Sequence, residues 1–341
     1  MPMPATNRQL RLAKRPTGMI DESTFDLVEE SIGELADGEY VVRITYLSID
    51  PTQRVWIREE ESYLPPVQIG EVMRSGAIGE VIESRAPDVP VGSLVTGLLG
   101  WQEHAVCGPE TLANVVPPGL PLRQMMGVLG TTGITAYFGM LDVGQAKDGD
   151  TVVVSGAAGA TGSVAAQIAK IQGGRVIGIA GGAEKCAWLR DECGLDATID
   201  YKSEDVGTRL AELCPDGIDV VFENVGGEIL DASLQHLAIG ARVALCGAIA
   251  TYNDVDQADP IHWYMNLVVK RARIEGFLVL DFLERFPEAV LQLATWVMEG
   301  KIAWRDTVVE GLENAPDALN MLFRGENLGK LLVQVGPDPS A

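Results

Sequence analysis

Histidine and cysteine are scarce in this sequence, which holds three histidines and five cysteines among 341 residues. The cysteines include no Cys-x-x-Cys pair, and an odd number of scattered cysteines is not the pattern of a disulfide framework. The histidines, at positions 104, 236 and 262, share no metal-ligand spacing with one another or with the cysteines. Metal-dependent alcohol oxidation is therefore disfavoured, and no metal site is predicted.

Long apolar runs and an excess of positive charge are also absent. No stretch of about 18 uninterrupted apolar residues occurs, which argues against a membrane-spanning helix. The formal net charge is −22, from 48 acidic against 26 basic residues. A field of that sign disfavours nucleic acids and anionic membranes as partners. The N-terminal segment MPMPATNRQLRLAKRP lacks the apolar core of a signal peptide, so a cytoplasmic location is expected.

The length and the hydrophobic content of 47% suit two domains with sizeable cores. Residues 1–128 are rich in strand-like segments between Gly, Pro and Asp turns, and we expect a distorted β-barrel there. Residues 129–305 alternate between helix-like and strand-like patterns, which predicts a doubly wound parallel sheet with right-handed crossovers. A strand over 330–335 is expected to rejoin the barrel, so that 306–341 complete it. The predicted fold class is α/β.

The individual elements can be assigned from hydrophobic periodicity and turn signals. In the N-terminal part we expect strands over 41–49, 76–83, 94–99 and 103–107. In the second part we expect helices over 130–141, 163–172, 183–193, 206–214, 229–239, 262–269 and 282–300, and strands over 151–155, 175–179, 197–200, 218–222, 241–246 and 274–280. A short helix opening at Asn314 precedes the last strand.

The segment after the first predicted parallel strand carries the clearest functional signal. Gly156, Gly159 and Gly162 separate the strand over 151–155 from a helix, and a second strand follows. Glycines let the backbone approach a pyrophosphate closely, and the helix start offers N–H groups and the positive end of the dipole. The order strand, glycine turn, helix, strand is that of a dinucleotide-binding domain. The spacing G-x-x-G-x-x-G is less specific than G-x-G-x-x-G, so a purely structural glycine turn is the alternative.

The end of the second strand favours NADP(H) over NAD(H). NAD-specific sites carry an acidic residue there, which accepts hydrogen bonds from the adenosine ribose. Here the residues at 180–182 are Ala-Gly-Gly, and Lys185 follows three residues later. A gap of small residues followed by a cation suits a 2′-phosphate, and Tyr201 and Lys202 could close the same pocket. The alternative for Lys185 is a solvated helix residue.

Several segments together resemble the zinc-free medium-chain dehydrogenase/reductase superfamily. The resemblance covers nearly the whole chain and is greatest to the branch of leukotriene and prostaglandin reductases, plant alkenal double-bond reductases and bacterial curcumin reductases. The segments that carry it are LSIDPTQR (47–54), IGEVMRSGAIGEV (69–81), GWQEHAV (100–106), SGAAGATGSVAAQIAK (155–170), FENVGG (222–227), CGAIATYN (246–253), EGFLV (275–279) and ENLGKLLV (326–333).

The resemblance implies a GroES-like barrel for the substrate domain and NADPH-dependent reduction of a C=C bond conjugated to a carbonyl, in a ketone or an aldehyde. Matching positions would place the pyrophosphate on Gly159, Ala160, Thr161 and Gly162, and the 2′-phosphate on Lys185 and Tyr201. The nicotinamide and its ribose would be surrounded by Asn224, Cys246, Gly247, Ala248, Tyr252, Phe277, Leu278, Val279 and Asn327.

One departure from the family concerns the substrate pocket. Relatives usually have Asp-Pro-Tyr-Met-Arg where this chain has Asp-Pro-Thr-Gln-Arg over 50–54, so a pocket-lining tyrosine of several relatives is Thr52 here. We expect the pocket size to depend on Thr52, Tyr63, Tyr252 and Leu278, and on the loops near 254–260. The sequence does not choose among a lipid, a diarylheptanoid and a short alkenal as the substrate.

Tyr252 is the candidate catalytic residue. Hydride transfer to the β-carbon of an enone places negative charge on the carbonyl oxygen, which an O–H donor would stabilise as an oxyanion hole does. A phenol, with a pKa of about 10, is a donor at neutral pH, and the resemblance puts Tyr252 beside the nicotinamide. The alternative is a tyrosine that merely packs the cofactor cleft.

Two other functions are kept as alternatives: a quinone reductase, and a non-catalytic NADPH-binding protein, for which the loss of the family tyrosine at Thr52 gives some support.

The predicted strand over 274–280 would lie at the sheet edge, where an apolar strand invites pairing with a second copy. A homodimer with a continuous sheet is therefore expected, as in the family.

Overall fold

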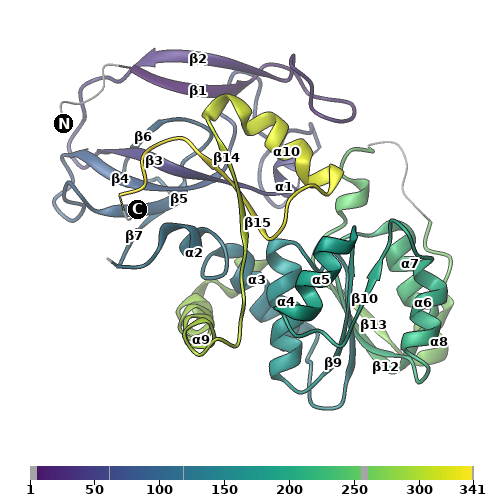
Figure 1. Cartoon of the computed structure of the whole chain (residues 1–341). Coiled ribbons are helices and arrows are strands. Elements are labelled where there is room, and N and C mark those ends of the chain that lie inside the picture. The colour runs from purple at the N-terminus through teal and green to yellow at the C-terminus, as the bar shows by residue number, and fades with distance from the viewer. Residues whose placement is uncertain (1–5, 61, 118, 255–259, 340–341) are drawn as a thin grey trace. The chain divides into compact units, whose positions relative to one another are not determined.

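The computed structural model describes residues 6–60, 62–117, 119–254 and 260–339 (Figure 1). The chain forms two compact units. Unit 1 comprises Met1–Met126, Thr307–Asn327 and Leu331–Ala341, and unit 2 comprises Gly127–Asp306 and Leu328–Lys330.

Unit 1 is built on antiparallel strands. The strands that form it are β1 (Thr6–Leu12), β2 (Phe25–Ser31), β3 (Tyr40–Ile49), β4 (Gly76–Ser84), β5 (Leu94–Leu98), β6 (His104–Cys107), β7 (Ala113–Val116), β14 (Asp306–Glu310) and β15 (Lys330–Gln334). Its helical segments are α1 (Thr52–Trp56), α2 (Leu122–Met126), the 3-10 turn η4 (Leu312–Asn314) and α10 (Ala315–Arg324). A seven-stranded sheet has the order β14-β15-β3-β4-β5-β7, with β6 also on β3, and β1 and β2 form a separate ribbon.

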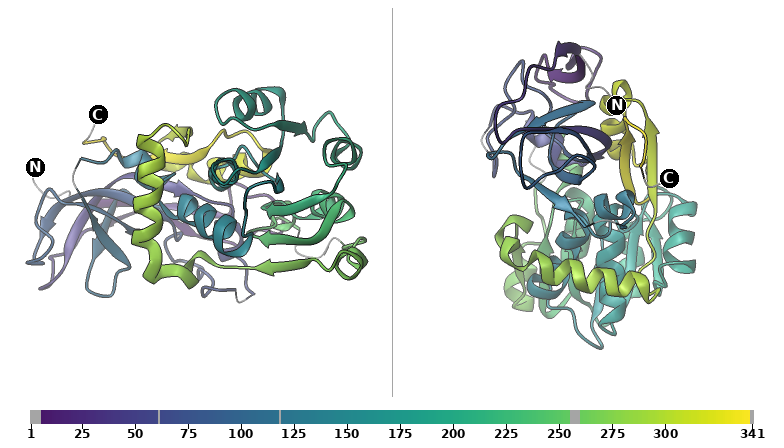
Figure 2. Two further views of the ribbon diagram at one scale, coloured as in Figure 1. Left: turned by 90° about the horizontal axis from the view of Figure 1, so that it is seen from below. Right: turned by 90° about the vertical axis from the view of Figure 1, so that its left-hand side faces the viewer.

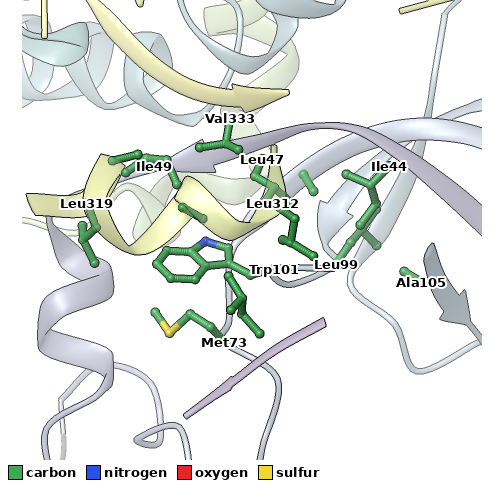
Figure 3. Close-up of a cluster of buried hydrophobic side chains, with 14 of the residues drawn as sticks. Ile44, Leu47, Ile49, Met73, Leu99, Trp101, Ala105, Leu312, Leu319 and Val333 are labelled. Atoms are coloured by element: carbon green, nitrogen blue, oxygen red, sulfur yellow. The ribbon is translucent and has the colours of Figure 1, made fainter. Parts of the chain in front are cut away.

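The core of unit 1 explains this arrangement. β3 is buried along nearly its whole length, because β4, β6 and β15 all pair with it. Figure 3 shows the fully buried Trp101 among apolar side chains from the sheet, including Leu47 and Val333, with Met73 beside it. β15 pairs antiparallel with β3, with Val333 opposite Leu47. This confirms that the C-terminal strand rejoins the N-terminal sheet.

Unit 2 contains the parallel sheet. Its strands are β8 (Thr151–Val154), β9 (Arg175–Ala180), β10 (Ala197–Asp200), β11 (Ile218–Glu223), β12 (Leu237–Leu245) and β13 (Arg273–Gly276), in the order β10-β9-β8-β11-β12-β13. Its helical segments are α3 (Thr131–Phe138), the π-helical turn η1 (Gly139–Val143), α4 (Ala160–Ile171), α5 (Ala183–Asp191), α6 (Val206–Leu213), α7 (Gly227–Gln235), η2 (Ile249–Thr251), α8 (Met265–Lys270), η3 (Val279–Arg285) and α9 (Phe286–Met298).

Helices cover both faces of this sheet, with α6, α7 and α8 on one face and α3, α4 and α9 on the other (Figures 1 and 2). From β8 the chain proceeds outward through β9 to β10, then returns to β11 and proceeds in the opposite direction to β13. The carboxyl ends of β8 and β11 therefore flank the point where the strand order reverses, which is where α/β sheets bind ligands. The predicted α/β class, with a doubly wound sheet and a barrel-like domain, is confirmed.

Several predicted boundaries were wrong. The helix predicted over 229–239 ends at Gln235, because residues from Leu237 onward pair with β11 and extend β12. The strand predicted over 274–280 ends at Gly276, and 3-10 turns occupy the start of the helix predicted over 282–300. That helix, α9, begins at Phe286, with a proline in its first turn. For the boundary at Leu237, an apolar run fitted both the helix and the strand period, and pairing with β11 decided.

Other elements were missed or shifted. The sequence patterns did not predict β1, β2, β7, β14, α1 or α2. The helix predicted over 163–172 begins at Ala160, the helix predicted over 262–269 begins at Met265, and the helix predicted over 130–141 passes into a π-helical turn at Gly139. Most of the missed elements are short or half-exposed, so their patterns contain few buried positions from which a period could be read.

Candidate cofactor and active site

The glycine-rich turn leads from β8 into the N-terminus of α4. Gly156 has a φ of +57°, and a Cβ at Gly162 would overlap the carbonyl oxygen of Gly156, so the turn closes only with glycines at these two places. Gly159 is the N-cap of α4, and no side chain caps this helix. Ala160, Thr161 and Gly162, three of the predicted pyrophosphate residues, form its first turn. Uncapped N–H groups at a helix start fit an anionic group such as a pyrophosphate.

A returning segment of the chain lies against this turn. Gly329 forms a parallel bridge with Gly159, and its N–H donates to the carbonyl of Ala158 at 2.9 Å. A Cβ at Gly329 would overlap the carbonyl oxygen of Arg305. The motif over 326–333 therefore reaches the glycine turn through a main-chain approach that only glycine allows. Asn327, two residues earlier, is buried and belongs to unit 1; its predicted place beside the nicotinamide ribose stays a prediction.

Two lysines and a tyrosine gather beyond the end of β9. A Cβ at Gly181 would lie 2.8 Å from the Tyr201 ring and 2.9 Å from Lys202 Cε, so both side chains cross the Ala-Gly-Gly segment. Lys185, on α5, is half-buried. Burial and the neighbouring Lys202 charge lower the pKa of Lys185. Two ammonium groups that repel each other in a partly buried corner favour an anion between them, which fits a 2′-phosphate.

Sequence reasoning missed a carboxylate in this corner. Asp200, the last residue of β10, accepts hydrogen bonds from the N–H groups of Gly182 at 2.7 Å and Lys202 at 3.1 Å. The N–H of Gly182 leads the causes that lower the pKa of Asp200. Its sequence position, at the end of the third strand instead of the second, gave no sign that it reaches back to residues 180–182. The contact shows that Asp200 holds the backbone of this corner in place.

An open cavity of about 410 Å³ lies at the carboxyl ends of β12 and β13. Six predicted site residues line it: Cys246, Gly247, Ala248, Tyr252, Phe277 and Leu278. Leu245, Gly276 and Asp281 line it as well and were not predicted. Val279 lies just beyond, at the start of η3. Asp281 Oδ2 accepts a hydrogen bond from the Leu278 N–H at 3.3 Å, which holds the turn that follows β13.

The Tyr252 side chain lies against residues 247 and 248, which directly follow β12. Its phenol oxygen accepts a hydrogen bond of 3.1 Å from the Ala248 N–H, and a Cβ at Gly247 would lie 3.1 Å from the same oxygen. The 3-10 turn η2 makes this contact possible by bringing residue 252 back over residue 248. A phenol that accepts one hydrogen bond still carries its own O–H as a donor.

Asn224 connects the central strands. Its side-chain Nδ2 donates to the Ser155 carbonyl at 2.7 Å, and its main-chain N–H donates to Ser155 Oγ at 2.8 Å. The side chain therefore ties the end of β11 to the end of β8, at the point of strand-order reversal. Its predicted place beside the nicotinamide stays a prediction.

Of the four residues predicted to line the substrate pocket, two belong to each unit. In unit 1, the hydroxyl groups of Thr52 and Tyr63 are hydrogen-bonded to each other, and Trp56 Nε1 donates to the Tyr63 hydroxyl at 3.2 Å. Position 52 lacks the tyrosine of several relatives, but Thr52 contacts the phenol of Tyr63. Tyr252 and Leu278 belong to unit 2 and lie together at its cavity. Of the loops near 254–260, residues 255–259 lie outside the residues that the structure describes.

Comparisons with known proteins identify the family of the chain. Residues 8–115 match the model of the N-terminal domain of oxidoreductases, and residues 160–296 match that of zinc-binding dehydrogenases. The NADPH-dependent curcumin reductase of Escherichia coli is 39% identical over 97% of this chain and 98% of its own. The chain belongs to the medium-chain dehydrogenase/reductase superfamily. Within it, the chain falls in the branch of curcumin, alkenal and prostaglandin reductases.

Two further relatives support the assignment to this branch. The NADP⁺-dependent 2-alkenal reductase of Nicotiana tabacum is 38% identical over 97% of this chain and 98% of its own. The crystal structure of CurA from Vibrio vulnificus in complex with NADPH superposes with a TM-score of 0.92, at 41% identity, over 97% of this chain and 100% of that one. This member of the family is an NADP-dependent oxidoreductase, and its cofactor is NADP(H).

Two structural findings concern metals and membranes. One matching family model is named for zinc, yet within the described ranges no three side chains of His, Cys, Asp or Glu gather into a potential metal site. All five cysteines are free thiols. None of the helices in the described part of the chain has the length and hydropathy that crossing a membrane requires.

Proposed function

We propose that this enzyme reduces the C=C bond of α,β-unsaturated ketones or aldehydes, with hydride delivered to the β-carbon and a proton from water taken up by the α-carbon of the resulting enolate. The observation that carries the proposal is the cavity at the ends of β12 and β13, which presents the Tyr252 phenol within a wall of small and apolar residues. The relatives named as curcumin and alkenal reductases support the same chemistry. NADPH, when bound, supplies the hydride.

The cofactor is proposed to lie along the carboxyl edge of the sheet in unit 2. The first turn of α4, residues 159–162, would hold the pyrophosphate through its N–H groups. Lys185, Tyr201 and Lys202 would hold the 2′-phosphate. The cavity lined by Gly247, Ala248, Phe277 and Leu278 would hold the nicotinamide, because its mostly apolar wall suits a flat ring.

Tyr252 is proposed to donate its O–H to the carbonyl oxygen of the substrate. Charge builds up on that oxygen as the hydride arrives, and a donor already in place stabilises the charge without reorganising. The hydrogen bond from the Ala248 N–H makes the phenol O–H a stronger donor, because a phenol oxygen that accepts a hydrogen bond disperses negative charge more readily. Thr52 and Tyr63 of unit 1 are proposed to set the size of the substrate pocket.

The first test is NADPH oxidation with a panel of acceptors: a short alkenal, a cyclic enone, curcumin, a benzoquinone and a simple ketone, with NADH in parallel. We expect turnover of the enones and the alkenal with a preference for NADPH. Turnover of the quinone alone would replace the proposal with a quinone reductase. Tight NADPH binding without turnover of any acceptor would indicate a non-catalytic NADPH-binding protein.

A homodimer is proposed through β13. This strand lies at one edge of the six-stranded sheet, so one side of its backbone is open to pairing. Large apolar side chains are exposed on the segments that flank it, including Val268 and Val269 on α8 and Leu280 and Leu283 on η3. Light scattering that gives the mass of one chain at micromolar concentration would refute this proposal.

A further inference from the structure

Glu223, the last residue of β11, is a fully buried carboxylic acid. Its Oε1 atom accepts three hydrogen bonds, from Ser155 Oγ at 2.8 Å, from the Val225 N–H at 2.6 Å and from the Gly226 N–H at 2.8 Å. Oε2 is buried and has no hydrogen-bond partner in the described part of the chain. Buried carboxylates are uncommon unless they are paired with a cation, and this one is bound only by neutral donors.

The main chain of Glu223 places it directly behind the cavity. Its carbonyl oxygen accepts hydrogen bonds from the N–H groups of Cys246 at 2.9 Å and Gly247 at 3.1 Å, and both residues line the cavity. An ionised Glu223 side chain would also affect the Cys246 thiol. Burial, and then the Glu223 charge, raise the pKa of the Cys246 thiol to about 12. The two main-chain contacts therefore place Glu223 next to Cys246 and Gly247 of the cavity wall.

That charge would distinguish the two forms of the cofactor. The nicotinamide ring is neutral in NADPH and cationic in NADP⁺, and the rest of the molecule is the same. In a low-dielectric interior a negative charge behind the ring stabilises a cation much more than it would in water. We propose that Glu223 strengthens the binding of NADP⁺ relative to NADPH. The inference rests on the proposed placement of the nicotinamide in this cavity.

The residues around Glu223 make the charge sensitive to pH. Burial raises its pKa, and the N–H groups of 224–226 and the Ser155 hydroxyl oppose that shift. Among the described residues that face it, Ser155 on β8 does not titrate, and the Cys246 thiol at the end of β12 stays neutral below its own pKa of about 12. Glu228 on α7 is exposed. The preference for NADP⁺ should therefore increase as the pH rises through the raised pKa of Glu223.

The test compares dissociation constants for NADP⁺ and NADPH in the wild-type enzyme and in Glu223→Gln, at pH 8.5, by isothermal titration. The amide keeps the shape of the side chain and an oxygen that can accept the three hydrogen bonds, but it removes the charge. We expect NADP⁺ binding to weaken fivefold or more while NADPH binding changes less than twofold. Glu228→Gln is the matched control, because it removes the same charge from an exposed position nearby, and its ratio should equal that of the wild type.

Each other outcome overturns the inference. Loss of affinity for both cofactors by the same factor would show that Glu223 is only structural, and an unchanged ratio would show that its charge does not reach the ring. Should Glu223→Gln not fold, the wild-type ratio measured between pH 5 and pH 9 decides, and a flat ratio refutes the charge effect. The acceptor panel tests the two proposals separately. Enone turnover with an unchanged ratio of the NADP⁺ and NADPH dissociation constants would refute this inference and leave the proposed function intact. A changed ratio without turnover of any enone would support this inference and refute the proposed function.

Discussion

The Ala248 N–H donates a hydrogen bond of 3.1 Å to the phenol oxygen of Tyr252, four residues further along the chain. This contact fixes the one phenol among the residues that line the cavity of unit 2. Because the donor is a main-chain group, substitution at position 248 leaves the contact in place, whereas substitution at position 252 removes it. The role of Tyr252 can therefore be tested at Tyr252 itself with little disturbance of the cavity wall.

Replacing Tyr252 with Phe should lower turnover of an enone by tenfold or more, which corresponds to about 1.4 kcal/mol of transition-state stabilisation. The NADPH dissociation constant should stay within twofold, because the ring that packs the cavity is retained. Steady-state kinetics and a binding titration on the same preparation check both parts. Unchanged turnover would reduce Tyr252 to a packing residue.

Replacing Lys185 with Met should weaken NADPH binding by about tenfold and leave NADH binding unchanged, because only NADPH carries the 2′-phosphate that the lysine would contact. Lys147→Met is the control, since Lys147 is exposed at a turn on the surface and should affect neither cofactor. An equal loss for NADPH and NADH would place the effect of Lys185 outside the 2′-phosphate corner.

The pH dependence of cofactor choice follows from the same lysine. Burial and the Lys202 charge lower the pKa of Lys185, so it loses its positive charge at a lower pH than an ordinary lysine. The preference for NADPH over NADH should be complete below that lowered pKa and should decline as the pH rises through it. The ratio of the two dissociation constants, measured from pH 7 to pH 10, checks this. A ratio that stays constant across the range would contradict it.

Gly139 should tolerate no side chain. It lies in the π-helical turn η1, where a Cβ would overlap the Phe277 ring and lie 2.6 Å from Phe222 Cε2. Gly139→Ala should therefore destabilise the fold by about 1–3 kcal/mol and displace Phe277 from the cavity wall. Gly207→Ala is the matched control, because Gly207 is also helical but has only ordinary contacts at 3.7 Å or more. It should be neutral or stabilising by up to about 1 kcal/mol. Urea unfolding measures both.

Arg242 should contribute more to stability than an arginine whose ion pairs lie nearer the solvent. Its side chain is about one-tenth exposed, pairs with the buried Asp150 and donates to the carbonyls of Gly144 and Gln145, both at 3.0 Å. Arg242→Met leaves a buried carboxylate without its cation, which should lower the free energy of unfolding by about 3–5 kcal/mol.

Arg209 provides the comparison for Arg242. It pairs with Glu204 and Glu212 at the surface, and Arg209→Met should cost less than about 1 kcal/mol. Equal losses for the two variants in urea unfolding would contradict the assigned burial.

The cofactor domain could be read from the sequence because its signals are local. A β-branched strand, three glycines and a helix are adjacent in the chain, and each parallel strand is buried on both faces, so its apolar run is continuous. The predicted strand over 197–200 was correct at both ends. Predicted boundaries were wrong where one apolar run fitted both the helix and the strand period. Leu237, for example, was predicted within a helix, but it pairs with Ile218 of β11.

The site residues also differ in whether a local sequence pattern or a contact between distant segments determines them. Cys246, Ala248 and Phe277, predicted to surround the nicotinamide, line one cavity, because each follows a parallel strand and the ends of neighbouring strands meet at one edge. Asp281 was missed because it lies in a turn that was predicted as strand and helix. Asp200 and Glu223 were missed because their roles depend on contacts with other segments, and no local pattern records those.

The sequence by itself determined the class of fold, the family and the cofactor, because those depend on which residues follow which along the chain. Only the tertiary structure decided what buried polar groups do. In the sequence, Glu223 is one residue of the motif over 222–227, and it becomes a buried acid behind a cavity because β8, β11 and β12 end together. Burial and strand order are properties of segments packed against one another, and the free energy of a charge depends on that packing far more than on its neighbours in the chain.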